Sequence, residues 1–234
     1  DTLEALARAI FKDWFVDFGP TRAKQEGAAP YLAPEIWDLF PDRLDAEGKP
    51  EGWELPPVAS VATIRGGKQL KKEKFIERGP VPVFGGAGVM GYTDQYNAKG
   101  FVISVGRVGA YCGQFFFFSG KAWINNNASL IVPNEGVSGE WLFFALRALD
   151  INLIKKGAAQ PFVSNSDIAA MRIVDPGQAI VESFHDLISP LLLRQKANED
   201  ESSVLAQTRD LLLPKLMSGE IRLREAEQTA EAVL

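Results

Sequence analysis

The chain has 234 residues, 46% of them apolar, a formal net charge of −5, one cysteine and one histidine. A single cysteine excludes an internal disulfide framework and a multi-cysteine metal site, and a lone histidine leaves little material for a zinc site or a Ser-His-Asp arrangement. No run approaches the roughly 18 consecutive apolar residues that a membrane span needs, so we expect a cytoplasmic protein with no membrane, metal or cofactor.

The charge is distributed unevenly along the chain. Residues 1–59 carry six basic and twelve acidic side chains and residues 181–234 carry six and ten, whereas residues 60–180 carry thirteen and eight. A basic middle region can neutralise phosphates whatever the charge of the whole chain. On charge alone, an ordinary solvated surface explains the pattern equally well.

The first expected element is a helix over residues 1–19. Gly19 and Pro20 should end it, because glycine suits a left-handed cap and proline cannot continue the hydrogen-bond ladder. The apolar stripe begins without a clear helix start, so we expect a chain cut inside a longer helix. The stripe follows three- and four-residue spacing and comprises Leu3, Leu6, Ala7, Ile10, Phe11, Trp14, Phe15 and Phe18.

The next two regions differ in texture. Residues 20–52 are rich in proline, glycine and charge, which indicates a wrapped linker pinned by its few aromatic residues. Residues 53–177 contain short β-type runs broken by glycine, which predicts a twisted, mostly antiparallel sheet. One helix should follow Ser138, a good N-cap before the apolar run at Trp141. The region is therefore expected to be one mixed α+β domain.

Residues 178–234 should form a long helix and a tail. Ten positions from Phe184 to Leu216 alternate steps of four and three, which fits one heptad frame and implies a helical partner. Asn198, in the middle of that frame, either sets the register or is a solvent-exposed break. Pro190 and Pro214 should kink or interrupt the helix, and Gly219 should terminate it.

Motifs for catalysis are weak. The glycine-rich run Gly86–Gly91 matches a dinucleotide-binding pattern, but turn-forming residues follow it where a helix should begin, and no acidic residue lies about twenty positions on. We interpret it as a flexible loop with close backbone approach. Cys112 has no neighbouring histidine to activate it, and His185 lies among apolar helical positions. We therefore expect no catalytic residue.

Polar side chains typical of nucleic-acid binding are more frequent. Glycine-flanked basic and amide residues of the middle region can hold phosphates or reach base edges, although each segment alone is only a polar loop. The candidate DNA-binding residues are Arg65, Lys68, Lys71, Lys72, Lys74, Tyr92, Gln95, Arg107, Tyr111, Asn125, Asn126, Lys155, Lys156 and Gln160.

Two segments resemble conserved regions of one family. "ALARAIFKDWFVDFGPTRAK" (5–24) is similar to the end of the central conserved region, and "TRDLLLPKLMSGEIRL" (208–223) to the distal conserved region, of specificity subunits of type I restriction-modification systems. Between them, "GWELPPVASVATIRGG", "ISVGRVGAYCG", "WINNNASLIV" and "KKGAAQPFVSNSDIAAMRIVDP" resemble landmarks of that family's target recognition domain.

The resemblance implies a non-catalytic subunit that reads one half of a bipartite site in double-stranded DNA. It also implies conserved helices that form an antiparallel coiled coil, dock modification (methyltransferase) subunits and reach the restriction (translocase) subunit indirectly. A single recognition domain implies a half-subunit or a C-terminal fragment. Two alternatives stay open: a helical scaffold that ignores DNA, and a nucleotide-binding enzyme that uses the glycine run 86–91.

The two apolar helices also predict self-association. Leaving both stripes in water would expose a large apolar surface, so the isolated chain should form a two-fold homodimer through its helices. The residues assigned to this subunit interface are Leu3, Ile10, Trp14, Phe18, Leu205, Leu212 and Leu216.

Overall fold

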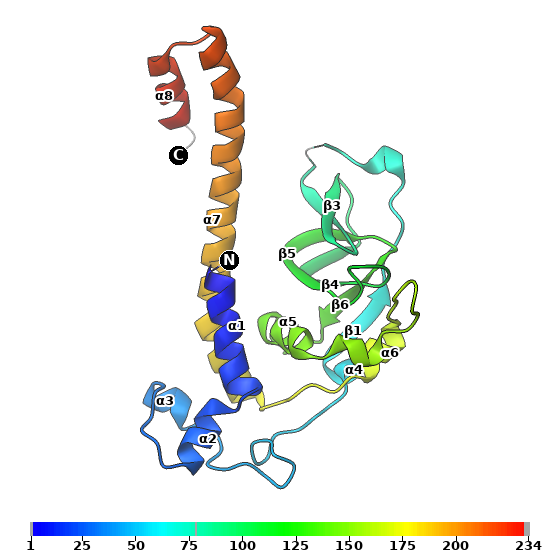
Figure 1. Ribbon diagram of the computed structural model, residues 1–234, viewed down its shortest axis with the longest axis vertical. Helices are drawn as coiled ribbons and strands as arrows, with labels where there is room; N and C mark the ends of the chain where they lie inside the picture. The colour runs from blue at the N-terminus through cyan, green and yellow to red at the C-terminus, as the bar shows by residue number, and fades with distance from the viewer. Residues whose placement is uncertain (1, 78, 232–234) are drawn as a thin grey trace. The chain divides into compact units, whose positions relative to one another are not determined.

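The computed structural model describes residues 2–77 and 79–231 (Figure 1). The chain divides into two compact units, one formed by Arg8–Asp186 and the other by Asp1–Ala7 together with Leu187–Leu234. The division runs through the first helix and the longest one.

The chain begins with helix α1 (Thr2–Phe15), followed by the short helices α2 (Gly19–Gln25) and α3 (Pro34–Trp37). The expectation that Gly19 and Pro20 end the first helix is wrong. α1 ends four residues before Gly19, at Phe15, where the Asp17 amide donates to the Lys12 carbonyl over 2.8 Å, and Phe18 takes the left-handed conformation with φ of 56°. Gly19 and Pro20 instead open α2, because a proline in the first helical turn needs no amide donor.

The aromatic residues of the α1 stripe pack against aromatic rings from elsewhere in the chain. Phe11 and Phe15 pack against Phe184, with ring centroids 5.6 Å and 5.2 Å apart, and Trp14 packs edge-on against Phe40 at 5.2 Å. Phe40 comes from the segment between the first helices and the sheet, so the expected pinning of this linker by aromatics is observed. Aromatic pairs in this geometry stabilise the fold beyond the apolar area that they bury.

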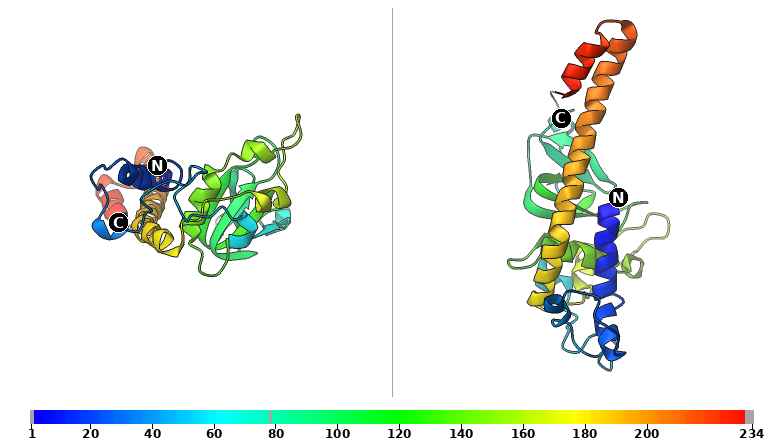
Figure 2. Two further views of the ribbon diagram at one scale, coloured as in Figure 1. Left: turned by 90° about the horizontal axis from the view of Figure 1, so that it is seen from below. Right: turned by 90° about the vertical axis from the view of Figure 1, so that its left-hand side faces the viewer.

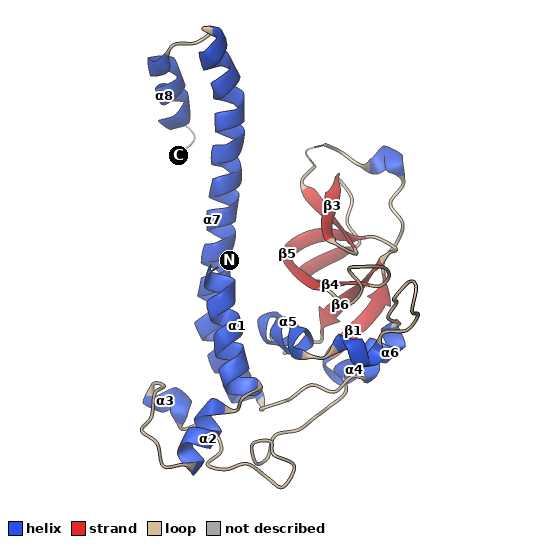
Figure 3. Cartoon of the chain, in the orientation of Figure 1, coloured by secondary structure: helices blue, strands red, loops and turns tan. Residues whose placement is uncertain are grey.

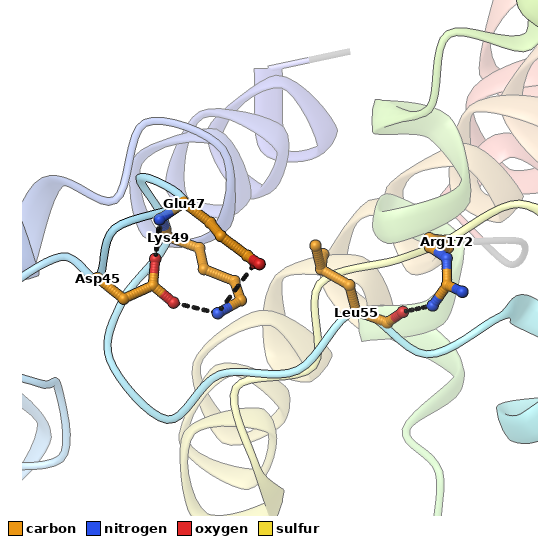
Figure 4. Close-up of polar contacts among 5 residues, drawn as sticks. All are labelled: Asp45, Glu47, Lys49, Leu55 and Arg172. Carbon is orange, nitrogen blue, oxygen red and sulfur yellow. Dashed lines mark hydrogen bonds and ion pairs between the residues drawn. The ribbon is translucent and has the colours of Figure 1, made fainter.

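Polar contacts organise the chain where it enters the sheet domain (Figure 4). Lys49 forms ion pairs with Asp45 and with Glu47, the second over 3.6 Å. The Arg172 guanidinium donates through Nη1 to the Leu55 carbonyl over 2.7 Å. Leu55 precedes the first helix of the domain and Arg172 follows its last helix. This hydrogen bond therefore joins the segment that enters the domain to the segment that leaves it.

The middle of the chain forms a six-stranded sheet, as expected for a mixed α+β domain (Figure 3). Its spatial order is β1-β6-β4-β5-β2-β3, and every pairing is antiparallel except β2 with β5. The prediction of a mostly antiparallel sheet is confirmed. The strands are β1 (Ala62–Gly66), β2 (Val81–Gly85), β3 (Gly88–Thr93), β4 (Ala98–Gly106), β5 (Phe115–Ile124) and β6 (Ala128–Pro133).

Short helices flank the sheet: α4 (Val58–Val61), η1 (Lys72–Lys74), α5 (Gly139–Ala148), η2 (Ile151–Ile154) and α6 (Asn165–Ala170). α4, α5 and α6 lie at one end of the sheet, and η1 lies toward the other (Figure 3). The predicted cap at Ser138 is confirmed, since its hydroxyl accepts the Trp141 amide over 3.2 Å. A buried cluster fills the sheet and comprises Phe84, Ala98, Val102, Ala122, Ile124, Ala128 and Leu130.

The C-terminal part is helix α7 (Gln178–Ser218) followed by α8 (Leu223–Glu231), which lies alongside the last turns of α7 (Figure 2). Pro190 and Pro214 lie inside α7 and do not interrupt it, so interruption, one of the two expected effects, does not occur. Each removes one amide donor, and the remaining turns of this 41-residue helix hold it together. Gly219, with φ of 74°, ends α7 as predicted, with the Glu220 amide bonded to the Lys215 carbonyl over 2.9 Å. Within the described residues, none of the helices combines the length and apolarity required to cross a bilayer.

Candidate nucleic-acid interface

Several loops of the sheet domain meet through backbone hydrogen bonds. The Gly67 amide donates to the Ala128 carbonyl over 3.0 Å, and the Lys68 amide donates to the Ile124 carbonyl over 2.9 Å. The Gly109 amide donates to the Pro161 carbonyl over 2.9 Å. We call the surface formed by these segments the loop surface, and it comprises residues 67–72, 86–90, 106–113, 125–127 and 155–163.

Glycine is required where these loops cross. A Cβ built on Gly106 would lie 2.4 Å from the Tyr111 carbonyl oxygen and 2.5 Å from that of Gly86. A Cβ on Gly67 would lie 2.0 Å from the Asn125 carbonyl oxygen. Backbone cannot move aside as a flexible side chain can, so these positions admit only glycine. The high glycine content of these loops thus reflects how closely their backbones approach one another.

Arg107 belongs to the loop surface and is bonded to two of its other segments. Its amide donates to the Asn127 carbonyl and its carbonyl accepts the Val163 amide, each over 3.0 Å, so the backbone is fixed on both sides. The side chain is half-buried, and its Nε has no hydrogen-bond partner within the described residues. A guanidinium is always charged and offers a planar fork of donors. The guanidinium is therefore carried on a backbone that is fixed on both sides.

The predicted lysines between β1 and β2 lie on the surface. Lys68, Lys71, Lys72 and Lys74 are all exposed. The turn η1 that carries the last two is fixed by the Thr93 hydroxyl, which donates to the Lys74 carbonyl over 2.8 Å. Exposed ammonium groups on a fixed turn can contact phosphates at little cost in backbone entropy.

Three other candidates have differing surroundings. Arg65 is exposed and donates through Nη2 to the Asn97 carbonyl over 3.1 Å. Tyr92 is exposed on β3, and Gln95 is half-buried in the turn that follows. The first two are therefore accessible to a ligand, and the third only in part.

Two predicted amide residues behave differently from each other. Asn125 is buried, and its side-chain oxygen accepts the amides of Leu70 and Asn126 over 3.2 Å and 2.9 Å. Its assignment as a base-reading residue is therefore corrected: it holds the loop after β1 against the turn after β5. Asn126 is exposed and remains available.

The segment between η2 and α6 forms a small hairpin. Lys156 and Phe162 exchange both backbone hydrogen bonds, over 2.9 Å and 2.8 Å. The Lys156 ammonium is paired with Asp167 over 2.7 Å, and this contact and then the Ser164 hydroxyl lower the pKa of Asp167. The Lys156 ammonium is thus held in an ion pair, and because its side chain is 56% exposed, its assignment to DNA binding stays a prediction. Gln160, at the hairpin tip, is exposed.

Cys112 and its neighbours occupy the turn after β4. The Cys112 thiol is buried and donates to the Arg107 carbonyl over 3.4 Å. Burial raises the pKa of the Cys112 thiol, and the nearby Lys155 ammonium opposes this shift without overcoming it. Cys112 thus packs as a thiol, as expected, while Lys155 is half-buried beside it and Tyr111 is exposed.

The alternatives based on chemistry find little support in the geometry. Gly86–Gly91 spans a hairpin between β2 and β3, so the run is not the flexible loop we expected, and no helix follows it to receive a pyrophosphate. His185 Nδ1 lies 3.0 Å from Glu140 Oε2, which links α7 to α5. Among the described residues, no group of three histidine, cysteine or acidic side chains is placed to hold a metal ion.

The residues assigned to a subunit interface fall into two groups. Trp14 is 1% exposed inside its own unit, and Phe18 packs on Trp53 with ring centroids 5.7 Å apart. We therefore remove Trp14 from the interface. In the unit that contains most of α7, Leu205 is exposed, and Leu3, Leu212 and Leu216 are half-buried. Ile10, in the unit Arg8–Asp186, is also half-buried.

Sequence reasoning missed the exposed apolar side chains of the loop surface. Val108 and Phe162 face each other across a β-bridge and remain exposed. Tyr96, outside these loops, is exposed with the Lys121 ammonium 4.8 Å above its ring. The two consecutive apolar residues Phe162 and Val163 could have indicated a short strand. Its partner Val108 is more than fifty residues away in sequence, so no local pattern could have predicted the pairing.

Comparison with known proteins gives consistent matches. The family model described as the type I restriction modification DNA specificity domain matches residues 50–200. The MjaIX specificity subunit of Methanocaldococcus jannaschii is 26% identical over 96% of this chain and 54% of its own length. The HindI specificity subunit of Haemophilus influenzae is 25% identical over 94% of this chain and 62% of its own length.

A solved structure, the S subunit of a type I restriction-modification system from M. genitalium, has a similar fold. It superposes with a TM-score of 0.58 at 20% identity, covering 71% of this chain and 46% of that one. The chain thus spans little more than half the length of the curated relatives it matches.

Proposed function

Because the chain belongs to the family of type I restriction-modification DNA specificity domains, we propose that it reads one half of a bipartite site in double-stranded DNA. Residues 53–177 serve as the target recognition domain, between a conserved helix (1–19) with its linker (20–52) and the distal helix and tail (178–234). The chain supplies the sequence specificity, and the modification subunit carries out the covalent chemistry. It needs no cofactor and works in the cytoplasm.

The observation that carries this proposal is the loop surface, in which Arg107 is bonded to the segments 125–127 and 155–163. Several loops are fixed to one another by backbone hydrogen bonds, and the residues around them include four exposed lysines between β1 and β2. A rigid frame that presents positive charge and amide groups suits a duplex, since phosphate contacts position a protein and base contacts specify the sequence.

The division of labour follows from exposure and pairing. Lys68, Lys71 and Lys72 carry exposed charge and suit phosphates, which are contacted without regard to sequence. Arg107 and Asn126 read base edges in this proposal, since a guanidinium pairs with guanine and an amide with adenine. No covalent step is required of this chain.

The helices serve assembly. They dock modification subunits, and through these the restriction subunit is reached indirectly. In isolation, the chain forms a two-fold homodimer through α7, whose exposed apolar side chains include Leu205 and Leu211. A dimer would restore two recognition domains, and its symmetry would require inverted-repeat half-sites.

Fluorescence anisotropy on the complex of this chain with its modification subunit tests the proposal. The probes are a duplex carrying the methylated motif of a host with the complete system and a scrambled duplex of the same composition. We expect tighter binding to the first, with both affinities falling as salt rises. Equal affinity for both duplexes would contradict sequence reading. Loss of all affinity for both duplexes at low salt would support the scaffold alternative, and binding only to a nucleotide would support the enzyme alternative.

A further inference from the structure

A small three-stranded ladder lies within the loop surface. Phe162 exchanges both of its backbone hydrogen bonds with Lys156. On its other side, the segment 161–163 pairs with 107–109, through the Gly109 amide to the Pro161 carbonyl and the Val163 amide to the Arg107 carbonyl. Val108 and Lys156 are therefore the cross-strand neighbours of Phe162, one on each side.

The two faces of this ladder differ in burial. Residues directly opposite in a sheet project their side chains to the same face, and successive residues alternate. Val163 is 1% exposed and fills the interior, whereas Val108 and Phe162 are 41% and 42% exposed. The outward face therefore presents two apolar side chains, which we call the apolar ladder face. Lys156 lies beside them with its charge paired to Asp167.

The size and charge of the surroundings indicate the occupant. Two side chains are far too few for a stable protein interface, which buries roughly 800 Å² on each partner. The loop 67–72, which carries three exposed lysines, is joined to the ladder through residues 127 and 128: the Gly67 amide donates to the Ala128 carbonyl, and the Arg107 amide donates to the Asn127 carbonyl. This positive charge favours a polyanion. The major groove of DNA presents one apolar group at base edges, the C5 methyl of thymine, and apolar side chains are the groups that contact it.

We propose that Val108 and Phe162 contact the methyl group of a thymine in the half-site, so that the apolar ladder face determines specificity at an A·T pair. The inference rests on the proposed function and adds to it a particular base and a particular pair of side chains.

The test replaces each thymine of the half-site, one at a time, with deoxyuridine, which removes only the methyl group. Affinity of the complex with the modification subunit is measured by anisotropy. One substitution should weaken binding about fourfold, the factor that corresponds to burying one methyl group. The variant Val108→Thr with Phe162→Ser should lose affinity for the thymine duplex and show no further loss with deoxyuridine.

Two controls separate the outcomes. Leu153→Ser alters another exposed apolar side chain, outside the ladder, and should keep the sensitivity to deoxyuridine. The single variant Val108→Thr preserves side-chain shape, so it tests the contact without threatening the fold. The proposal is overturned if no deoxyuridine duplex binds more weakly, if the variant and the native chain lose equally, or if the half-site lacks an A·T pair. A native complex that ignores the mapped sequence altogether would overturn the proposed function itself.

Discussion

Arg107 illustrates what residue types reveal and what only the structure adds. The sequence predicts that Arg107 lies in a glycine-flanked turn. The structure adds that its Nε is buried and has no hydrogen-bond partner among the described residues. Its backbone is bonded on both sides, so the side chain is presented from a fixed base. This arrangement distinguishes Arg107 from an arginine that merely solubilises a surface.

Replacing Arg107 with lysine should therefore weaken discrimination at one base position by about 1–3 kcal/mol, because lysine keeps the charge and loses the planar fork. Affinity measured over a panel of single-base substitutions reports this directly. Arg43→Lys, in the linker, is the matched control and should leave discrimination intact. Unchanged discrimination in Arg107→Lys would refute a role in base reading.

The exposed lysines lead to a different prediction. Lys71→Ala with Lys72→Ala should weaken binding to every duplex alike and flatten the dependence of log affinity on log salt by about one unit for each lost contact. Lys196→Ala with Lys215→Ala removes two charges from α7 and should leave the slope unchanged. If the Lys71/Lys72 variant kept its salt slope and changed only its sequence preference, the phosphate assignment would be wrong.

Other residues show the limit of sequence at this scale. Asn125 and Lys156 have the same residue types as true ligand-binding groups, yet one is buried under the loop after β1 and the other is paired with Asp167. Asp167 is eleven residues from Lys156, and Leu70 is fifty-five from Asn125. Pairings across such separations depend on how the chain folds back, which no local pattern records.

At the scale of elements, local signals were reliable where local chemistry decides. The caps at Ser138 and Gly219 follow from side-chain and backbone preferences alone. Elements were misjudged where context overrides preference: Phe18 takes a left-handed conformation that glycine would favour, and α7 continues through two prolines. The long helix tolerates the loss of two amide donors because many other backbone hydrogen bonds support it.

The cap at Ser138 gives a stability prediction. Ser138→Ala removes the acceptor for the Trp141 amide, so the free energy of unfolding should fall by about 1 kcal/mol. Urea denaturation measures the change. Ser183→Ala is the control, because its hydroxyl donates to the Ala179 carbonyl within a helix that is already bonded. Equal stability of the Ser138 variant and the native chain would show that the cap contributes nothing.

At the scale of the whole molecule, the apolar face of α7 supports self-association. Leu205→Asp with Leu212→Asp should convert a concentration-dependent dimer into a monomer, because charge in an apolar contact loses its hydration. Light scattering over a range of micromolar concentrations measures the mass. Ser203→Asp with Gln207→Asp adds the same charge beside that face and should leave the dimer intact. A native chain that stays monomeric at every concentration would contradict the proposal.

The central claim, that this chain dictates which DNA sequence is modified, is tested most directly by mapping methylated bases across a genome. One host expresses the modification subunit alone, a second adds this chain, and a third adds its Arg107→Ala variant. The account predicts a bipartite methylated motif only in the second host, with relaxed or lost methylation in the third. The same methylation pattern in all three hosts would contradict it.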